Sequence, residues 1–264
     1  HNATTWIAEN EEWDVLASYY PFLDHVGHAF MHYHPPQQEF VGDFEYRMYN
    51  DVVNSAYRFS DLMLGRLMAL AGPEANIVLV SDHGFYNDHR RVKPSDSNRL
   101  ILDRDHSQFG IFVASGPAFK AGSNPIGANL LDIAPTILNA LNLPAGRDMP
   151  GRSLLEVMNM PSPIPPIDSW EQEPGNFFEC ERDQTLDSNE SKALLDNFVQ
   201  MGYVDPAAAK GGPHAQSLID VNNYNLARVY ASSDRHDQAL DLLIDIVERN
   251  PLRLDMALSA TESY

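Results

Sequence analysis

Two short, uninterrupted apolar runs constrain the fold more than any other feature: ANIVLVS at residues 75–81 and GIFVAS at residues 110–115. Runs of this length and composition are typical of strands that are buried on both faces of a parallel sheet. A third segment, WDVLASYY at residues 13–20, is apolar and aromatic and stops at a proline, so it also predicts a buried strand.

Segments with the spacing of amphipathic helices alternate with these runs. FLDHVGHAFMHYH at residues 22–34 predicts one helix, and residues 44–71 predict a longer one that ends at Gly72. A third helix is expected at residues 129–141. Alternating strands and helices predict an α/β fold with a mostly parallel sheet and helices on both of its faces.

The composition changes after about residue 158. MPSPIPPIDSWEQEPGN, at residues 160–176, contains five prolines and predicts a linker or a strap on the surface. We therefore divide the chain into a hydrolase-like domain at residues 1–158, a proline-rich linker or strap at 159–190 and a helical tail at 191–264.

The tail has the spacing of one tetratricopeptide-like repeat, so an all-α helical-repeat tail is expected after the α/β domain. An ordinary amphipathic helical hairpin is the alternative. A helical repeat of this kind offers a surface for a protein partner. The positions that match the repeat are Leu226, Ala227, Tyr230, Ala239, Leu243, Ile246 and Pro251.

The charge balance argues against one class of partner. The chain has 37 acidic and 18 basic residues and a formal net charge of −19, so it should repel the phosphate backbone of nucleic acids. No apolar run approaches the roughly 20 residues of a membrane-spanning helix, and we expect no membrane segment. The single cysteine, Cys180, has no second cysteine with which to form a disulfide or a thiolate metal site.

Three elements carry side chains suited to catalysis. Asp24 and His28 are four residues apart, so on a helix both can reach one cation. Asp82 and His83 follow the first apolar run, at the carboxyl end of a predicted strand, where α/β sheets place ligands. His106 precedes the second apolar run. Together, two carboxylates and three imidazoles have the ligand chemistry of a two-zinc hydrolase.

Each element taken singly has a structural alternative. An aspartate four residues before a histidine is also typical of a surface or capping pair on a helix, and an Asp-His pair can simply end a strand. Arg90 and Arg91, which follow His89, could contact an anionic substrate. We expect the remaining histidines of this region to face solvent or lie on helix surfaces: His25, His32, His34 and His89.

These motifs resemble the type I phosphodiesterase/nucleotide pyrophosphatase family of the alkaline phosphatase superfamily. The resemblance implies an alkaline-phosphatase-like fold. It also implies that Asp24, His28 and His106 hold one zinc ion and that Asp82 and His83 hold a second; other divalent transition metals are an alternative. The matching stretches are YYPFLDHVGHAFMHYHPP (19–36), VLVSDHGF (78–85), HSQFGIFVASGPAFK (106–120) and NLLDIAPTILNALNLPAGRDMPGRSLLEV (129–157).

The family pattern also contains an aspartate and a threonine or serine nucleophile upstream of the DxxxH element, and neither has a match here. Only 23 residues precede Asp24, and Thr4 and Thr5 lie too close to that element to replace the nucleophile. Thr136 matches a helix start that the family uses structurally. We therefore assign no catalytic nucleophile, and we interpret the chain as the C-terminal part of a larger enzyme whose N-terminal strands are missing.

The resemblance implies hydrolysis of phosphoric (di)esters or nucleotide pyrophosphate bonds through a covalent phospho-threonine or phospho-serine. The substrate would be a small-molecule phosphate ester, and its binding residues are not predicted. Sulfatases, phosphonate hydrolases and phosphomutases use the same scaffold and remain alternatives. A further alternative is a non-catalytic interaction protein that recruits partners through its helical tail.

Overall fold

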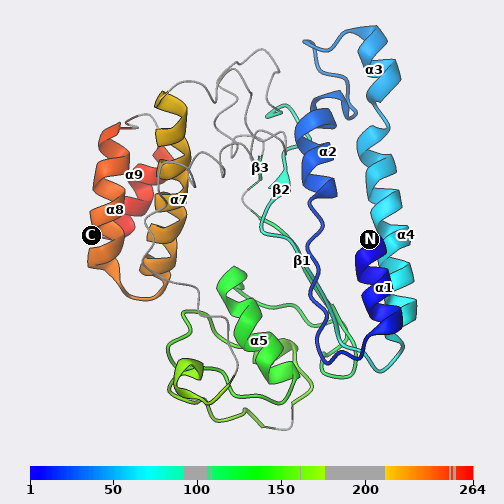
Figure 1. Cartoon of the computed structure of the whole chain (residues 1–264). Coiled ribbons are helices and arrows are strands. Elements are labelled where there is room, and N and C mark those ends of the chain that lie inside the picture. The colour runs from blue at the N-terminus through cyan, green and yellow to red at the C-terminus, as the bar shows by residue number, and fades with distance from the viewer. Residues whose placement is uncertain are drawn as a thin grey trace. The chain divides into compact units, whose positions relative to one another are not determined.

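The computed structural model describes residues 1–91, 106–107, 109–160, 162–175, 212–249, 251 and 254–263 (Figure 1). The chain divides into two compact units, with the boundary between Phe119 and Lys120. No helix in the described part is both long enough and apolar enough to cross a membrane. The domain boundaries expected from composition, at residues 158 and 190, stay predictions.

Helices form most of the first unit: α1 (Asn2–Asn10), α2 (Phe22–Phe30), the 3-10 turn η1 (Met31–Tyr33), α3 (Asp43–Tyr49) and α4 (Val52–Ala71). Both α1 and α2 pack against α4. The helix predicted at residues 22–34 is confirmed, with its last turn tightened to a 3-10 turn.

The helix predicted at residues 44–71 is interrupted, so α3 and α4 are separate helices. Asp51 lies at the break, and its carboxylate accepts hydrogen bonds from Asn54 Nδ2, Ser55 Oγ and Arg58 Nη1. These bonds hold the pKa of Asp51 below its usual value. Asp51 therefore starts a new helix by organising its first turns, and Gly72, at φ +80°, ends that helix where the sequence predicted.

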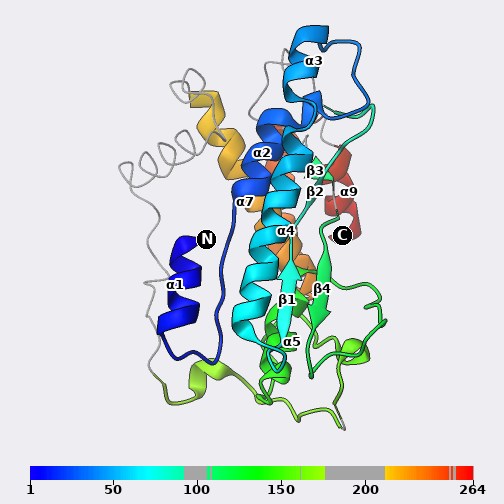
Figure 2. The ribbon, with the colours of Figure 1, turned by 90° about the vertical axis from the view of Figure 1, so that its right-hand side faces the viewer.

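The two apolar runs form strands, but their pairing differs from the prediction. Strands β1 (Ile77–Val80) and β4 (Phe112–Ser115) pair antiparallel, with Ile77 opposite Ser115 and Val80 opposite Phe112 (Figure 2). The parallel sheet is thus not confirmed among the described residues. The predicted burial of residues 77–80 is also wrong: Leu79 and Val80 are 38% and 37% exposed, because a two-stranded ribbon does not have both faces covered.

The strand predicted at residues 13–20 is wrong as well. This segment is irregular, and Tyr19 is 81% exposed. A strand needs a neighbour to satisfy its backbone hydrogen bonds, and no strand in the described residues pairs with this segment. Apolar content alone does not provide that neighbour.

The second unit begins with an irregular region around η2 (Leu130–Asp132) and α5 (Ile133–Ala140), and these two elements confirm the helix predicted at residues 129–141. The buried Asp132 carboxylate accepts from the backbone N–H groups of Asn129 and Arg152. Thr136 is also buried, and its Oγ1 accepts from the N–H of Leu154. Thr136 therefore fastens the segment that contains η3 (Leu155–Val157).

The described part of the proline-rich segment is held against the preceding residues. Trp170, at the start of η4 (Trp170–Gln172), donates from Nε1 to the carbonyl of Pro144 at 2.9 Å. An isolated bridge joins Gly146 to Ile167. These contacts hold residues 167–170 against residues 144–146. Residues 161 and 176–190 lie outside the description, and the assignment of 159–190 as a linker or strap stays a prediction.

The described tail consists of α7 (Gly212–Ser232), α8 (His236–Arg249) and α9 (Leu254–Ser263), and residues 191–211 of the predicted tail lie outside the description. Arg249 is paired with the buried Asp220 at 2.8 Å. The tetratricopeptide assignment stays a prediction. Of the positions that suggested it, four are fully buried between the helices: Ala227, Ala239, Leu243 and Ile246.

Candidate metal centre

Helix α2 and the ends of the strands bring the predicted ligands together within the first unit. Asp24 and His28 lie one turn apart on α2. His83 lies between β1 and the short strand β2 (Gly84–Phe85), and His106 begins β3 (His106–Ser107). Strands β2 and β3 pair antiparallel with Phe85 opposite His106, so this pairing carries His106 to the residues that follow β1.

The Oδ1 atom of Asp24 is the centre of the cluster. The Nε2 atoms of three histidines lie near it: His28 at 3.4 Å, His83 at 3.6 Å and His106 at 3.7 Å. Four ligands arranged tetrahedrally at 2.0–2.1 Å from a zinc ion are about 3.3–3.4 Å from one another. The cluster therefore has the spacing of a transition-metal site.

Two imidazoles face each other across this cluster. The Nε2 atoms of His28 and His106 are 3.0 Å apart, so they need a proton or a cation between them. The side chains of Asp24, His28 and His106 are 16–20% exposed. A divalent cation would satisfy the two nitrogens and the carboxylate together, and these three residues are the set that the family pattern assigns to the first ion.

Asp82 is the most exposed of the predicted ligands. Its side chain is 67% exposed, and its Oδ1 is 3.8 Å from His83 Nε2. His83 lies closer to the other ligands: Asp24, His83 and His106 each offer an atom within 4.8 Å of the others. The structure thus gathers Asp24, His83 and His106. His28 lies beside Asp24 and His106, and Asp82 lies beside His83.

The tautomer of His83 also favours metal binding. Its Nδ1 lies 3.1 Å from the carbonyl oxygen of Gly84, and since a carbonyl only accepts, Nδ1 carries the proton. In a neutral imidazole the lone pair is then on Nε2, which faces Asp24. A backbone carbonyl that holds the distal nitrogen of a histidine is a common support of metal ligands.

Phe85 forms a wall beside the cluster. Its ring stands edge-on to His28, His83 and His106, with centroids 5.1, 5.6 and 5.2 Å away. A Cβ on Gly27 would lie 2.6 Å from this ring, so α2 approaches Phe85 only because residue 27 is glycine. Sequence reasoning missed both residues. The signal for Phe85 was its spacing, since it follows His83 by two residues and can share a face with it in an extended segment.

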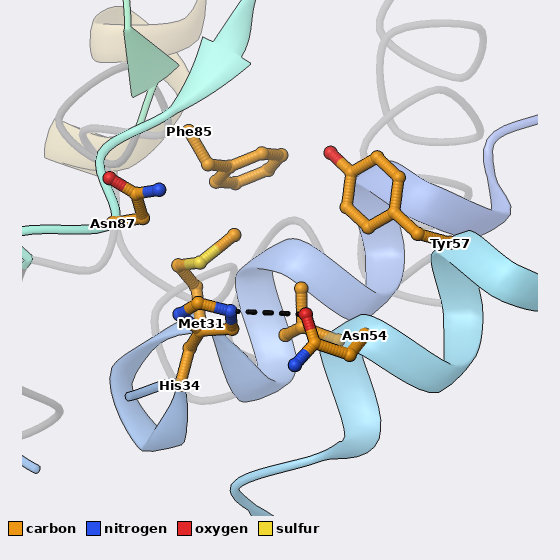
Figure 3. A pocket seen from close by; sticks show the side chains of 7 residues that line it. Met31, His34, Asn54, Tyr57, Phe85 and Asn87 are labelled. Atoms are coloured by element: carbon orange, nitrogen blue, oxygen red, sulfur yellow. Dashed lines mark hydrogen bonds between the residues drawn. The ribbon is translucent and has the colours of Figure 1, made fainter. Parts of the chain in front are cut away.

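Phe85 also lines a neighbouring pocket of about 240 Å³, seen in Figure 3. Because its ring contacts the three imidazoles as well, this pocket adjoins the cluster. His34, which was expected to face solvent or lie on a helix surface, is half-buried, and its Nε2 lies 3.3 Å from Asn54 Oδ1 on the pocket wall. The lining residues are Met31, His34, Val53, Asn54, Tyr57, Phe85 and Asn87.

The suggestion that Arg91 contacts an anionic substrate is wrong for this structure. Its side chain is buried, and its guanidinium donates to the backbone carbonyls of Asp88, Met31, His34 and Pro36. Burial lowers the pKa of Arg91 from its usual value. Arg91 instead ties residues 88–91 to the turn that follows α2.

Arg90 is held at the surface. It forms a two-pronged hydrogen bond with Asp88 and lies 4.2 Å above the ring of Tyr86. This contact lowers the pKa of Asp88 to about 2 and raises that of Arg90. In the structure, therefore, Arg90 pairs with a carboxylate of its own loop.

Comparison with known proteins gives two matches. The family model for type I phosphodiesterase / nucleotide pyrophosphatase matches residues 1–119, a range that contains the whole cluster. A 2,3-bisphosphoglycerate-independent phosphoglycerate mutase from Shewanella frigidimarina (strain NCIMB 400) is 25% identical over 150 residues, which are 56% of this chain and 24% of that protein. The match thus spans about a quarter of that relative. No solved structure matches.

Both matches point to the alkaline phosphatase superfamily. The matched family and the matched relative are of the phosphoesterase and phosphomutase types. An Asp/His/His cluster that could hold an ion is present in the matched range.

Proposed function

We propose that this chain is the metal-binding part of a two-zinc hydrolase that cleaves phosphoric (di)esters or nucleotide pyrophosphate bonds. Asp24, His28 and His106 would hold one ion, and Asp82 and His83 would contribute to the other. The observation that carries the proposal is the convergence of three imidazoles on one carboxylate oxygen of Asp24, within 3.4–3.7 Å, in the range that matches the phosphodiesterase family model.

The chemistry divides between the ions and the protein. Two bound zinc ions would stabilise the charge on the attacking and leaving oxygens of an in-line displacement at phosphorus. Asp24 supplies a negative charge, and the Gly84 carbonyl holds His83 with its Nε2 lone pair toward the site. Phe85 excludes water from one side. The positive charge of the ions would make the site attractive to phosphate esters in a chain whose formal charge is −19.

The nucleophile is proposed to be a threonine or serine that residues 1–264 do not supply. The burial of Thr136 and its hydrogen bond to the Leu154 N–H support leaving it out. With such a hydroxyl, the reaction would pass through a covalent phospho-threonine or phospho-serine, which water then hydrolyses.

A phosphomutase is the second candidate. The observation that favours it is the relative described as a phosphoglycerate mutase. In a mutase, the phosphoryl group held on the hydroxyl would return to a second hydroxyl of the substrate rather than to water. The ligands proposed here are the same for both reactions. The helical tail is proposed to recruit a protein partner in either case.

Metal content tests the first part of the proposal. The purified chain should bind zinc as measured by elemental analysis, and His28→Ala should reduce the bound zinc. His89→Ala is the matched control, because His89 is 87% exposed and lies 4.0 Å from Asp88, which is not one of the proposed ligands. Equal zinc loss in both variants would contradict the assignment.

Ligand binding and turnover test the second part. Inorganic phosphate should bind to the zinc-loaded chain and not to the chelated chain, as measured by calorimetry. Phosphate binding that is independent of zinc would refute a phosphoester site at this cluster. We expect no robust hydrolysis of a nitrophenyl phosphodiester by this chain alone. Robust turnover abolished by His28→Ala or Asp82→Ala would show that a nucleophile lies within residues 1–264.

A further inference from the structure

We propose that His83 is shared between the two ion positions: it completes the first site when one ion is bound and moves to Asp82 when the second ion arrives. This inference rests on the proposed metal-dependent function and adds a mode of regulation to it. With one ion bound, the site would be closed. With two ions bound, it would open for water and substrate.

The position of His83 is the first support. Its Nε2 is 3.6 Å from Asp24 Oδ1 and 3.8 Å from Asp82 Oδ1, so it is almost equally distant from a carboxylate of each proposed ion site. Its ring is stacked on His106, with centroids 3.5 Å apart and an angle of 14° between the planes. His83 therefore lies beside a ligand of the first ion, although the family pattern gives it to the second.

The number of donors around Asp24 is the second support. A catalytic zinc site has three protein ligands and keeps its fourth position open, whereas a structural site is closed by four. Asp24, His28 and His106 make three, and His83 adds a fourth nitrogen near the same carboxylate oxygen. A single ion bound by all four residues would have no position left for water.

The exposure of Asp82 explains why the second ion would bind later. Its side chain is 67% exposed, against 21% for His83. A well-hydrated carboxylate does not by itself draw His83 away from the cluster. A cation on Asp82 would draw His83 away, because it would offer His83 Nε2 a coordination bond in place of the bond to the first ion beside Asp24.

Competition for one ligand couples the two ions. Binding of the second ion removes a ligand from the first, so each ion weakens the affinity of the other by the same factor. Coupling of this kind is typically about 5–150-fold. We therefore expect the affinities of the two sites for zinc to differ by at least about 5-fold. The enzyme would then be inactive at zinc levels that fill only the first site.

A cobalt titration of the purified chain tests this directly, because the absorption of Co²⁺ reports its coordination number. The first equivalent should give a four-coordinate spectrum and bind about 5–150-fold more weakly in His83→Ala, because that variant loses the same ligand that the second ion would remove. Asp82→Ala is the matched variant. It should leave the affinity of the first ion unchanged and remove the second.

The outcomes separate this inference from the proposed function. If His83→Ala and Asp82→Ala both affect only the second ion, the sharing of His83 is refuted and the two-site assignment stands. If His28→Ala leaves the first ion bound as tightly as in the parent chain, the proposed metal site itself fails.

A measurement on the unsubstituted chain removes any dependence on how the variants fold. Imidazole nitrogen resonances observed by NMR should show His83 Nε2 shifting with the first equivalent of zinc, together with His28 and His106. A His83 resonance that moves only with the second equivalent would overturn the inference.

Discussion

Arg91 should be a main determinant of stability in the first unit, and its replacement by methionine tests this. The side chain is 5% exposed and donates to four backbone carbonyls. A hydrogen bond from a charged donor contributes about 1.5–3 kcal/mol. Three of the carbonyls keep a second donor when the guanidinium is removed: the Arg91 N–H for Asp88, the His34 N–H for Met31 and Gln38 Nε2 for Pro36. These terms do not add fully, since burying the guanidinium also has a cost. We expect Arg91→Met to lower the free energy of unfolding by about 2–4 kcal/mol.

Urea unfolding of the parent chain and of two variants provides the measurement. Arg91→Lys is the control, because an ammonium keeps the charge but cannot reproduce the spread of the guanidinium donors. It should lose about half as much stability as Arg91→Met. A change of less than about 0.5 kcal/mol in Arg91→Met, typical of an ordinary surface site, would refute this reasoning. If phosphate binding to the zinc-loaded chain fell while stability did not, Arg91 would be a substrate ligand after all.

Two further predictions concern other contacts. Gly110→Ala should destabilise the chain by about 1–3 kcal/mol and weaken zinc binding, because the new Cβ would lie 1.9 Å from the carbonyl oxygen of Ser81. Gly65→Ala, with nothing within 4 Å of its Cβ, should instead stabilise helix α4 by about 0.5–1 kcal/mol. Urea unfolding and zinc titration of both variants measure these effects. Arg152 lowers the pKa of Glu156 from 4.5 to about 2. The exposed pair should therefore stabilise the chain by under about 1 kcal/mol at neutral pH. This contribution should be lost as the pH falls from 4.5 through 2. The free energy of unfolding of Glu156→Gln and of the parent chain should be measured at several pH values. A lower stability of the variant that persisted below pH 2 would contradict this prediction.

The local features of this chain could be predicted from its sequence, because they depend on neighbouring residues. The spacing of apolar residues in 22–34 was sufficient to predict helix α2, and Asp24 and His28 share a face of it for the same reason. The runs IVLV and FVAS were recognised as strands. Their antiparallel direction and the exposure of Leu79 and Val80 were not, since an apolar run indicates a strand but specifies neither the direction of its partner nor what covers its faces.

The long-range features could not be predicted from spacing alone. His106 reaches the cluster only through the pairing of β3 with β2, whereas the sequence showed only a histidine that precedes the second apolar run. Arg91 shows the limit most clearly. A basic residue in a polar loop is expected to face solvent or a ligand, whereas its burial depends on carbonyls about 55–60 residues earlier.

The antiparallel pairing of β2 with β3 has a consequence for how this site could change in evolution or by design. Phe85 and His106 lie opposite each other, although residues 86–105 separate them in the chain. Doubling the length of a connection costs only about 0.6 kcal/mol in closure entropy, and it does not alter the pairing at its ends. Insertions or deletions after the buried Arg91, at residues 92–105, can therefore leave the ligands of the cluster where they are. We expect residues 92–105 to tolerate grafted sequences without rebuilding the metal site.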